Sequence, residues 1–293
     1  MSSLRPFAIV CVLSSLFMSG CSEPHGSADP HRGDETSAGG DTLVSVMTFN
    51  IRYDNPSDGI DSWEKRSRWV GSLIDSSGAA VVGLQEALRH QIDQIVEVAP
   101  RFSWVGVGRD DGKDAGEFSP ILYDSAQVRL LDWQSRWLSE APDSIGSVGW
   151  DASMTRIATL ATFFVIGSGD TLRVVNAHFD HLGEIAREES ARMVAHWSSK
   201  SSIVMGDFNF EPNSNPYRVI TTEKQLKDTA PEFGEGLIGT FRTFDPLSDT
   251  SRRIDYVFHG PGIEVLSYEV LSPIRNGRFP SDHLPVIAEI RVK

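Results

Sequence analysis

Short apolar runs recur from residue 43 to the carboxyl end of the chain, separated by polar segments rich in glycine and proline. Three longer segments place apolar side chains at intervals of three and four residues, which predicts helices at 62–77, 88–99 and 183–200. The short runs are typical of strands, predicted at 43–51, 79–86, 120–124, 159–166, 172–179, 202–208, 253–259 and 285–292. Together these elements indicate a mixed α/β sandwich.

Polar side chains stand where several of the predicted strands end. In "SIVMGDFNFEPNS" (202–214) the apolar run gives way to Asp207 and Asn209, which places the pair at the carboxyl end of a strand. Open α/β sheets bind ligands at that edge, although an isolated Asp-x-Asn can also simply close a turn. Other strand ends carry similar groups, which favours a site: Asn50, Gln85, Glu86, Asn176, His178, and, before the last strand, Ser281, Asp282 and His283.

Several carboxylates converging from distant segments need mutual pairing or a cation, because burying one unpaired is costly. A divalent cation explains the set economically. Hard ions such as Mg²⁺ prefer carboxylate and amide oxygens, which suits Asn50, Glu86 and Asp282. Zinc is disfavoured, since the sequence after residue 20 has no paired histidine spacing and no cluster of thiols.

The amino-terminal segment reads as an export signal. Arg5, the apolar run "FAIVCVLSSLF" and "MSGC" match a bacterial lipoprotein signal peptide at 1–20, with Cys21 as the lipidated mature terminus. The alternative is a chance cysteine beside a plain secretory cleavage site. Residues 21–41 are rich in Gly, Ser, Pro and charge and predict a lipid-anchored flexible tether. Ser22, by resemblance to other bacterial lipoproteins, suggests the outer membrane.

Composition and charge narrow the function. The chain has 293 residues, 40% of them hydrophobic and 23% charged, which predicts one large domain at 42–293. Without residues 1–20 it carries 26 basic against 40 acidic residues, a formal charge of −14. Nucleic acid is therefore not a favoured partner, because binding a long polyanion needs clustered Lys and Arg. We expect a monomer.

The motifs "TFNIR", "GLQE", "NAHFDH", "GDFN", "RIDYVF" and "SDHLPV", in this order, resemble the endonuclease/exonuclease/phosphatase superfamily, which has the deoxyribonuclease I-like fold. The longer matches "TFNIRYDNPSDGIDSWEKR", "GEFSPILYD", "WLSEAPD" and "GWDASMTRIAT" resemble its secreted bacterial branch of metal-dependent hydrolases. The resemblance implies a four-layered sandwich, with two mixed β-sheets packed face to face and flanked by helices. It also implies cleavage of phosphate esters with Mg²⁺, or Mn²⁺ as the alternative.

The resemblance carries roles to individual residues. Glu86 is similar to the principal metal ligand, supported by Asn50 and Asp282. Asp207 and Asn209 match the pair that orients the attacking water and the phosphate.

The remaining roles concern proton transfer and phosphate binding. His283 resembles the histidine that contacts the scissile phosphate, and Asp255 the carboxylate that holds its imidazole. His178 is similar to the second histidine, a candidate acid for the leaving oxygen. Asn176 and Arg156 are expected to face the phosphate. Arg52 stands where some nucleases of the superfamily carry an acid.

These observations favour an exported, metal-dependent phosphoesterase that hydrolyses a small or exposed phosphate mono- or diester by in-line attack of an activated water. Three alternatives stay open at this point. They are a secreted nuclease on DNA or RNA, a metal-independent carbohydrate hydrolase using Glu86 and Asp207, and a binding protein without turnover.

Overall fold

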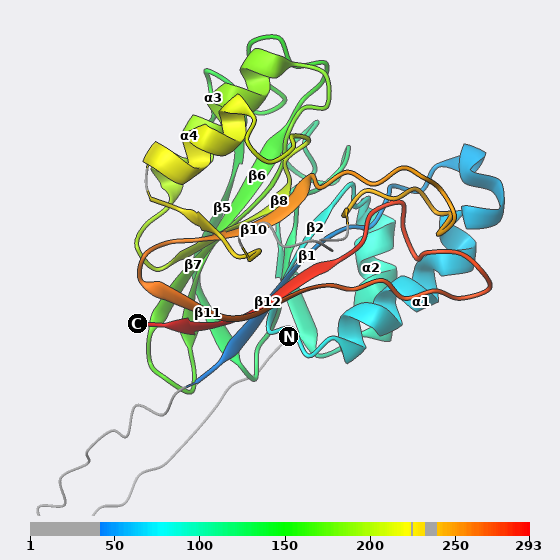
Figure 1. The fold of residues 1–293 in the computed structure, drawn as a ribbon, viewed down its shortest axis with the longest axis horizontal. Helices are drawn as coiled ribbons and strands as arrows, with labels where there is room; N and C mark the ends of the chain where they lie inside the picture. The colour runs from blue at the N-terminus through cyan, green and yellow to red at the C-terminus, as the bar shows by residue number, and fades with distance from the viewer. Residues whose placement is uncertain (1–41, 224, 232–238) are drawn as a thin grey trace, which may run out of the picture. The chain divides into compact units, whose positions relative to one another are not determined.

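The computed structural model describes residues 42–223, 225–231 and 239–293, so the predicted signal peptide, Cys21 and the tether lie outside the described residues. The described chain contains two six-stranded sheets (Figure 1). In order across the first sheet the strands are β11 (Ile263–Val270), β12 (Val286–Val292), β1 (Val44–Asn50), β2 (Val81–Gln85), β4 (Ile121–Asp124) and β3 (Phe102–Val105).

The second sheet is built in a similar way. Its order is β5 (Val128–Trp137), β6 (Ile157–Val165), β7 (Thr171–His178), β8 (Ser202–Asp207), β10 (Asp255–His259) and β9 (Lys227–Asp228). Each sheet has one parallel pair, β1 with β2 and β7 with β8, and its other pairs are antiparallel. Both sheets are therefore mixed, as the sequence predicts.

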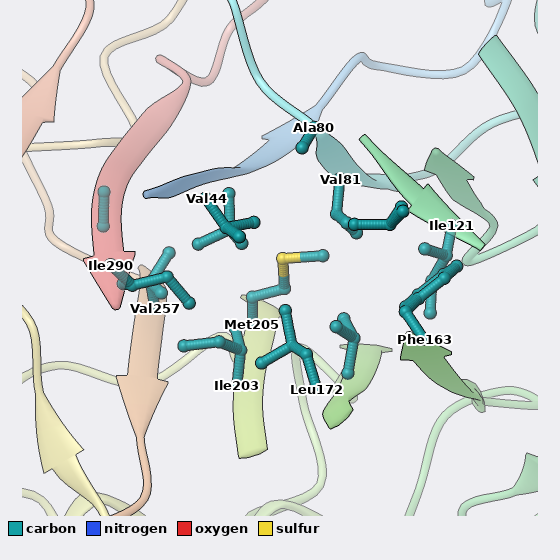
Figure 2. Close-up of a cluster of buried hydrophobic side chains, with 14 of the residues drawn as sticks. Val44, Ala80, Val81, Ile121, Phe163, Leu172, Ile203, Met205, Val257 and Ile290 are labelled. Atoms are coloured by element: carbon teal, nitrogen blue, oxygen red, sulfur yellow. The ribbon is translucent and has the colours of Figure 1, made fainter. Parts of the chain in front are cut away.

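The inner faces of the sheets form the central apolar core. Figure 2 shows Met205 of the second sheet among side chains that include Val81 of the first sheet and Ile203 of its own. Each is buried, and such a side chain contributes about 1.5–3 kcal/mol when it leaves water. This layer keeps the strands of the two sheets, and hence their carboxyl ends, in fixed relation.

Helices cover the outer faces of both sheets. Helices α1 (Trp63–Ser76) and α2 (Arg89–Val98) pack against the first sheet, and a 3₁₀ turn, η1 (Pro56–Asp61), precedes α1 (Figure 1). Helices α3 (Glu184–Trp197) and α4 (Asn215–Glu223) pack against the second sheet. The layers run helix, sheet, sheet, helix, which confirms the four-layered deoxyribonuclease I-like sandwich.

The structure contains all the predicted strands and helices, and besides the 3₁₀ turn η1 it adds five strands and α-helices that the pattern missed. Four of these are β3, β5, β9 and β11, and they are the edge strands of the two sheets. The middle of β5 is largely exposed, and β11 contains a register shift between Val265 and Ser267, so neither shows clean alternation. The fifth is α4, a helix of nine residues. In the described part of the chain, no helix combines the length and apolar character needed to cross a bilayer.

Candidate active site

A cavity of about 400 Å³ opens where the central strands of both sheets end. Seven of the ten predicted site residues line it: Glu86, Arg156, His178, Asp207, Asn209, Asp282 and His283. Asp255 and Asn50 do not line the cavity but contact His283 and Asp207, which do. Asn176 lies away from the cavity and contacts Pro120. Segments more than 200 residues apart in sequence thus meet at one site, as the strand ends predict.

Strand register places three of these side chains in a row. His178, the last residue of β7, is aligned with Asp207, the last residue of β8. Asp207 is in turn aligned with Asp255, the first residue of β10. Residues aligned on neighbouring strands project to the same face of a sheet, so the row follows directly from the pairing.

Asp255 and His283 form a buried carboxylate–imidazole pair. Nδ1 of His283 lies 3.1 and 2.9 Å from the two carboxylate oxygens of Asp255, and both residues are almost inaccessible to solvent. Although burial alone would lower it, the charges of Asp255 and Asp207 hold the pKa of His283 well above its ordinary value. The backbone N–H of Asp255 donates to the Thr240 hydroxyl at 3.0 Å, which fixes the carboxylate's strand.

Asp207 stands between the two histidines. Its Oδ2 lies 3.5 Å from Nε2 of His178 and 3.8 Å from Nε2 of His283. Its Oδ1 accepts the backbone N–H of Asn209 at 3.0 Å. Burial and the neighbouring Asp255 carboxylate raise the pKa of Asp207 to about 7. The negative charge of the buried carboxylates at the centre of the site is therefore not fully balanced by the positive charge of neighbouring side chains.

Asn50 links Glu86 to Asp207. Its Nδ2 donates to Oε1 of Glu86 at 3.1 Å and to Oδ2 of Asp207 at 3.0 Å, while its Oδ1 accepts the backbone N–H of Arg52. The sequence predicts that Asn50 supports Glu86 at a metal site. In this arrangement the amide nitrogen faces the carboxylates, so Asn50 holds Glu86 in place.

Three residues that lie one or two positions past a strand end adopt the left-handed backbone conformation that side chains other than glycine rarely take. These are Arg52, with φ of 56°, Glu86, with φ of 58°, and Asn209, with φ of 51°. Each ends its strand sharply and turns the chain at the cavity. Buried Arg66 supports the first of these turns, because its guanidinium donates to the carbonyl oxygens of Ile51 and Arg52.

Asp282 lines the cavity next to His283. Burial, with a smaller contribution from Glu86, raises the pKa of Asp282. Nη1 of Arg52 lies 3.9 Å from Oδ2 of Asp282, and the same guanidinium binds Asp58 at 3.1 and 3.2 Å. Arg52 thus brings a positive charge to the position where an additional acid would stand in some nucleases.

His178 has an acidic neighbour on the far side from Asp207. Its Nδ1 lies 4.0 Å from Oε2 of Glu117, which Arg109 binds through two hydrogen bonds of 2.8 and 2.9 Å. Burial lowers the pKa of His178 well below its ordinary value, and the charges of Arg156 and Arg109 lower it further. The imidazole is therefore neutral, and its Nε2 lies 3.2 Å from the amide nitrogen of Asn209.

Arg156 is buried in the wall of the cavity, 4% exposed. Its Nε donates to Asp180 at 3.3 Å and its Nη2 lies 2.8 Å from Nδ1 of His181. Asp180 also accepts from the Ser153 hydroxyl and from the backbone N–H of Gly183, so it is firmly held. A guanidinium fixed in this way can present its charge to an anion in the cavity.

Asn176 does not line the cavity, contrary to the expectation that it faces the phosphate. It is completely buried between the sheets, where its Nδ2 donates to the carbonyl oxygens of Leu84 and Pro120 at 2.8 Å each. Its Oδ1 accepts from Nε2 of Gln85 at 2.6 Å. These contacts join β7 to β2 directly behind Glu86 and His178, so Asn176 braces the two sheets.

The residues present fit a hard divalent cation. Two groups have potential ligand atoms within 4.8 Å of one another, Glu86 with His178 and Asp207, and Asp207 with Asp255 and His283. The raised pKa values of Asp207 and Asp282 show carboxylates desolvated without enough positive charge. A donor set dominated by carboxylate oxygens is typical of Mg²⁺ or Mn²⁺ sites.

Sequence reasoning did not assign several further residues of the cavity wall. They are Arg52, Tyr53, Glu117, Met154, His181, Phe241, Arg252 and Ile254. Six of them fall within quoted motifs, which was the available signal: Arg52 and Tyr53 in "TFNIRYDNPSDGIDSWEKR", Glu117 in "GEFSPILYD", Met154 in "GWDASMTRIAT", His181 in "NAHFDH" and Ile254 in "RIDYVF". The others come from loops whose course the strand pattern does not determine.

A four-layered sandwich with this set of acids, histidines and a buried arginine at its strand ends defines a hydrolase of phosphate esters. The chain belongs to the endonuclease/exonuclease/phosphatase family, whose model matches residues 47–283. Members of this family hydrolyse phosphate esters, which confirms the predicted enzyme class.

Solved structures agree with the assignment. An endonuclease/exonuclease/phosphatase from Bacteroides vulgatus is 37% identical, with a TM-score of 0.81, and the match covers 86% of this chain and 100% of that one. A family protein from Bacteroides thetaiotaomicron is 34% identical, with a TM-score of 0.80 and coverage of 86% and 98%. A mannosyl-6-phosphatase from the same organism is 35% identical, with a TM-score of 0.78 and coverage of 84% and 99%. No curated protein sequence matches the chain.

Proposed function

We propose that this protein is a Mg²⁺-dependent phosphoesterase that hydrolyses a small or exposed phosphate ester by in-line attack of water. The observation that carries the proposal is the row of His178, Asp207 and Asp255 beside Glu86, with His283 held by Asp255. This arrangement supplies oxygen ligands for a cation and an oriented imidazole within one cavity. Mn²⁺ is the alternative cation.

In the proposed mechanism Glu86 and Asp282 hold the cation, and Asn50 keeps Glu86 oriented. The cation, when bound, supplies positive charge that polarises the phosphoryl oxygens. Asp207 and Asn209 align the attacking water with the phosphorus. His283, held in one orientation by Asp255, contacts the scissile phosphate.

The remaining two side chains act on the phosphate and on the leaving oxygen. Arg156 presents its fixed guanidinium to a nonbridging phosphate oxygen. Nε2 of His178 faces Asp207 and Asn209. To act as the acid, His178 must first gain a proton at Nε2 and then pass it to the leaving oxygen. Because its pKa is lowered, His178 is mostly unprotonated at neutral pH. It is therefore less suited to donate a proton to the leaving oxygen than the sequence suggests.

A small substrate is favoured over nucleic acid by charge. Long polyanions are held by many Lys and Arg contacts, and the sequence after residue 20 carries −14 with no basic run. The wall of the cavity includes four carboxylates and three guanidinium groups, so Lys and Arg do not outnumber the acids there. The similarity to a mannosyl-6-phosphatase also supports a small phosphate ester.

Removing divalent cations should abolish activity. The substrate would be the best ester from a screen of nitrophenyl phosphates, nucleotides, sugar phosphates and phospholipid head groups. We expect EDTA to lower the kcat/KM of residues 42–293 on this ester at least about 100-fold, because several kcal/mol of charge stabilisation is lost. Adding Mg²⁺ should restore it. Full activity in EDTA would refute the metal-dependent mechanism, and a higher, salt-sensitive kcat/KM on duplex DNA than on any small ester would refute the preference for small substrates.

We also propose that the protein is exported and anchored to a membrane, the outer membrane in particular, through lipid on Cys21, which places it in the secreted branch. The support is the apolar run before "MSGC". Cys21→Ser should move the protein from the membrane to the soluble fraction or leave it unprocessed, as fractionation and mass spectrometry would show. Recovery of the variant entirely with membranes would mean that lipid on Cys21 is not the anchor.

A further inference from the structure

A second cavity, of about 430 Å³, lies next to the catalytic cavity. Asn209 and Arg252 line both, so the two spaces meet at these side chains. The walls of the second cavity come from the first turns of α3 and α4 and from the loop after β8. Its size falls within the range of small-molecule sites, about 300–1,000 Å³.

The second cavity is polar and carries both signs of charge. Three carboxylates line it, those of Glu184, Glu188 and Glu211, together with the guanidinium groups of Arg187 and Arg252. Two of these side chains already interact, since Nε of Arg252 donates to Oε1 of Glu211 at 2.8 Å.

Two further side chains of the second cavity bear on its capacity to bind. Nη1 of Arg187 donates to the carbonyl oxygen of Asp180, which fixes the guanidinium. The hydroxyl oxygen of Ser214 is buried and has no hydrogen-bond partner among the described residues. A buried hydroxyl without a partner is costly, and a ligand hydroxyl could supply one.

These walls discriminate between classes of ligand. An apolar group would have to desolvate five charged side chains without compensation. A second phosphate would meet three carboxylates against two guanidinium groups. A neutral group with several hydroxyls suits both kinds of wall, because each hydroxyl donates to a carboxylate and accepts from a guanidinium.

We propose that the second cavity binds the neutral, polyhydroxylated part of the substrate, such as a sugar ring, while its phosphate occupies the catalytic cavity. This inference rests on the proposed phosphoesterase function and specifies the substrate class. Asn209 and Arg252 then lie at the junction between phosphate and sugar. Selectivity for the leaving group comes from α3 and α4, and the chemistry comes from the strand ends.

The test compares two esters and a matched pair of variants. The esters are mannose 6-phosphate and phenyl phosphate, whose phenyl group carries no hydroxyl. The variants are Glu188→Ala and Glu189→Ala. Both glutamates are adjacent on α3 and both accept from Arg192, but only Glu188 lines the second cavity. Loss of a hydrogen bond to a charged group should lower kcat/KM for mannose 6-phosphate about tenfold or more in Glu188→Ala. Phenyl phosphate and Glu189→Ala should change less than about twofold.

A second measurement does not depend on turnover. Saturation-transfer NMR with methyl mannoside, which has no phosphate, should give signals with the wild type and with Glu189→Ala, and much weaker signals with Glu188→Ala. If the wild type hydrolyses neither ester, the proposed function fails on these substrates and the NMR result decides the sugar site by itself. Two kinetic results would overturn the sugar site: equal losses on both esters, or no selective loss in Glu188→Ala. Two NMR results would also overturn it: signals that are equal in the two variants, or no signal with the wild type.

Discussion

Asp255→Asn is expected to lower kcat by about 10³-fold or more while KM changes by less than about threefold. Both oxygens of Asp255 lie within 3.1 Å of Nδ1 of His283, and both side chains are almost inaccessible to solvent. The amide keeps the shape of the carboxylate but removes its charge, and its NH₂ can donate to Nδ1 and favour the wrong tautomer. The imidazole of His283 then stays in place, but its proton is on the wrong ring nitrogen for the reaction.

Steady-state kinetics with saturating Mg²⁺ would measure this effect. An NMR titration of the His283 ring should also show a lower pKa in the variant, because the carboxylate charge raises it in the wild type. Asp132→Asn on β5 is the matched control, an exposed aspartate on the same sheet. A kcat within about threefold of wild type, a barrier change under roughly 0.7 kcal/mol, would exclude Asp255 from the proposed role.

The fold could be predicted from the sequence where burial imposes a pattern. Central strands such as β1 and β8 are buried along almost their whole length, and their sequences, VSVMTFN and SIVMGD, are rich in apolar residues. Edge strands have a neighbour on one side, so their sequences are less constrained. In β5 the exposed positions include Leu131 and Trp133, which hides any alternation. Loop and edge segments therefore need the three-dimensional structure.

The site could be predicted where it depends on strand ends, and less well where it depends on loops. Register across β7, β8 and β10 brings His178, Asp207 and Asp255 together, as their positions at strand ends suggest. Asn176 shows the limit of this reasoning. A polar residue near a strand end can face either the cavity or the core between the sheets. The alternation of residues along β7 does not reveal that Asn176 has its partners on β2.

Glu86→Gln is expected to remove activity and to lower Mg²⁺ affinity by at least about 100-fold, the upper range for losing a residue that merely supports a metal ligand. Glu86 is the carboxylate at the turn after β2, and Asn50 and the backbone N–H of Tyr53 each donate to one of its oxygens. An amide keeps the length of the side chain but has one oxygen for these two donors and no charge for the cation. Loss of several kcal/mol of charge stabilisation corresponds to about 10³-fold or more in kcat.

Isothermal titration calorimetry with Mg²⁺ would measure the affinity, and thermal unfolding would establish that the variant is folded. We expect a modest destabilisation, about 1–3 kcal/mol, because one buried donor loses its acceptor. Glu97→Gln, at an exposed position of α2, is the control for a simple loss of surface charge and should bind Mg²⁺ like the wild type. If Glu86→Gln binds Mg²⁺ with unchanged affinity, Glu86 is not a metal ligand. The second group of potential ligands, Asp207, Asp255 and His283, would then be the leading candidate for the cation site.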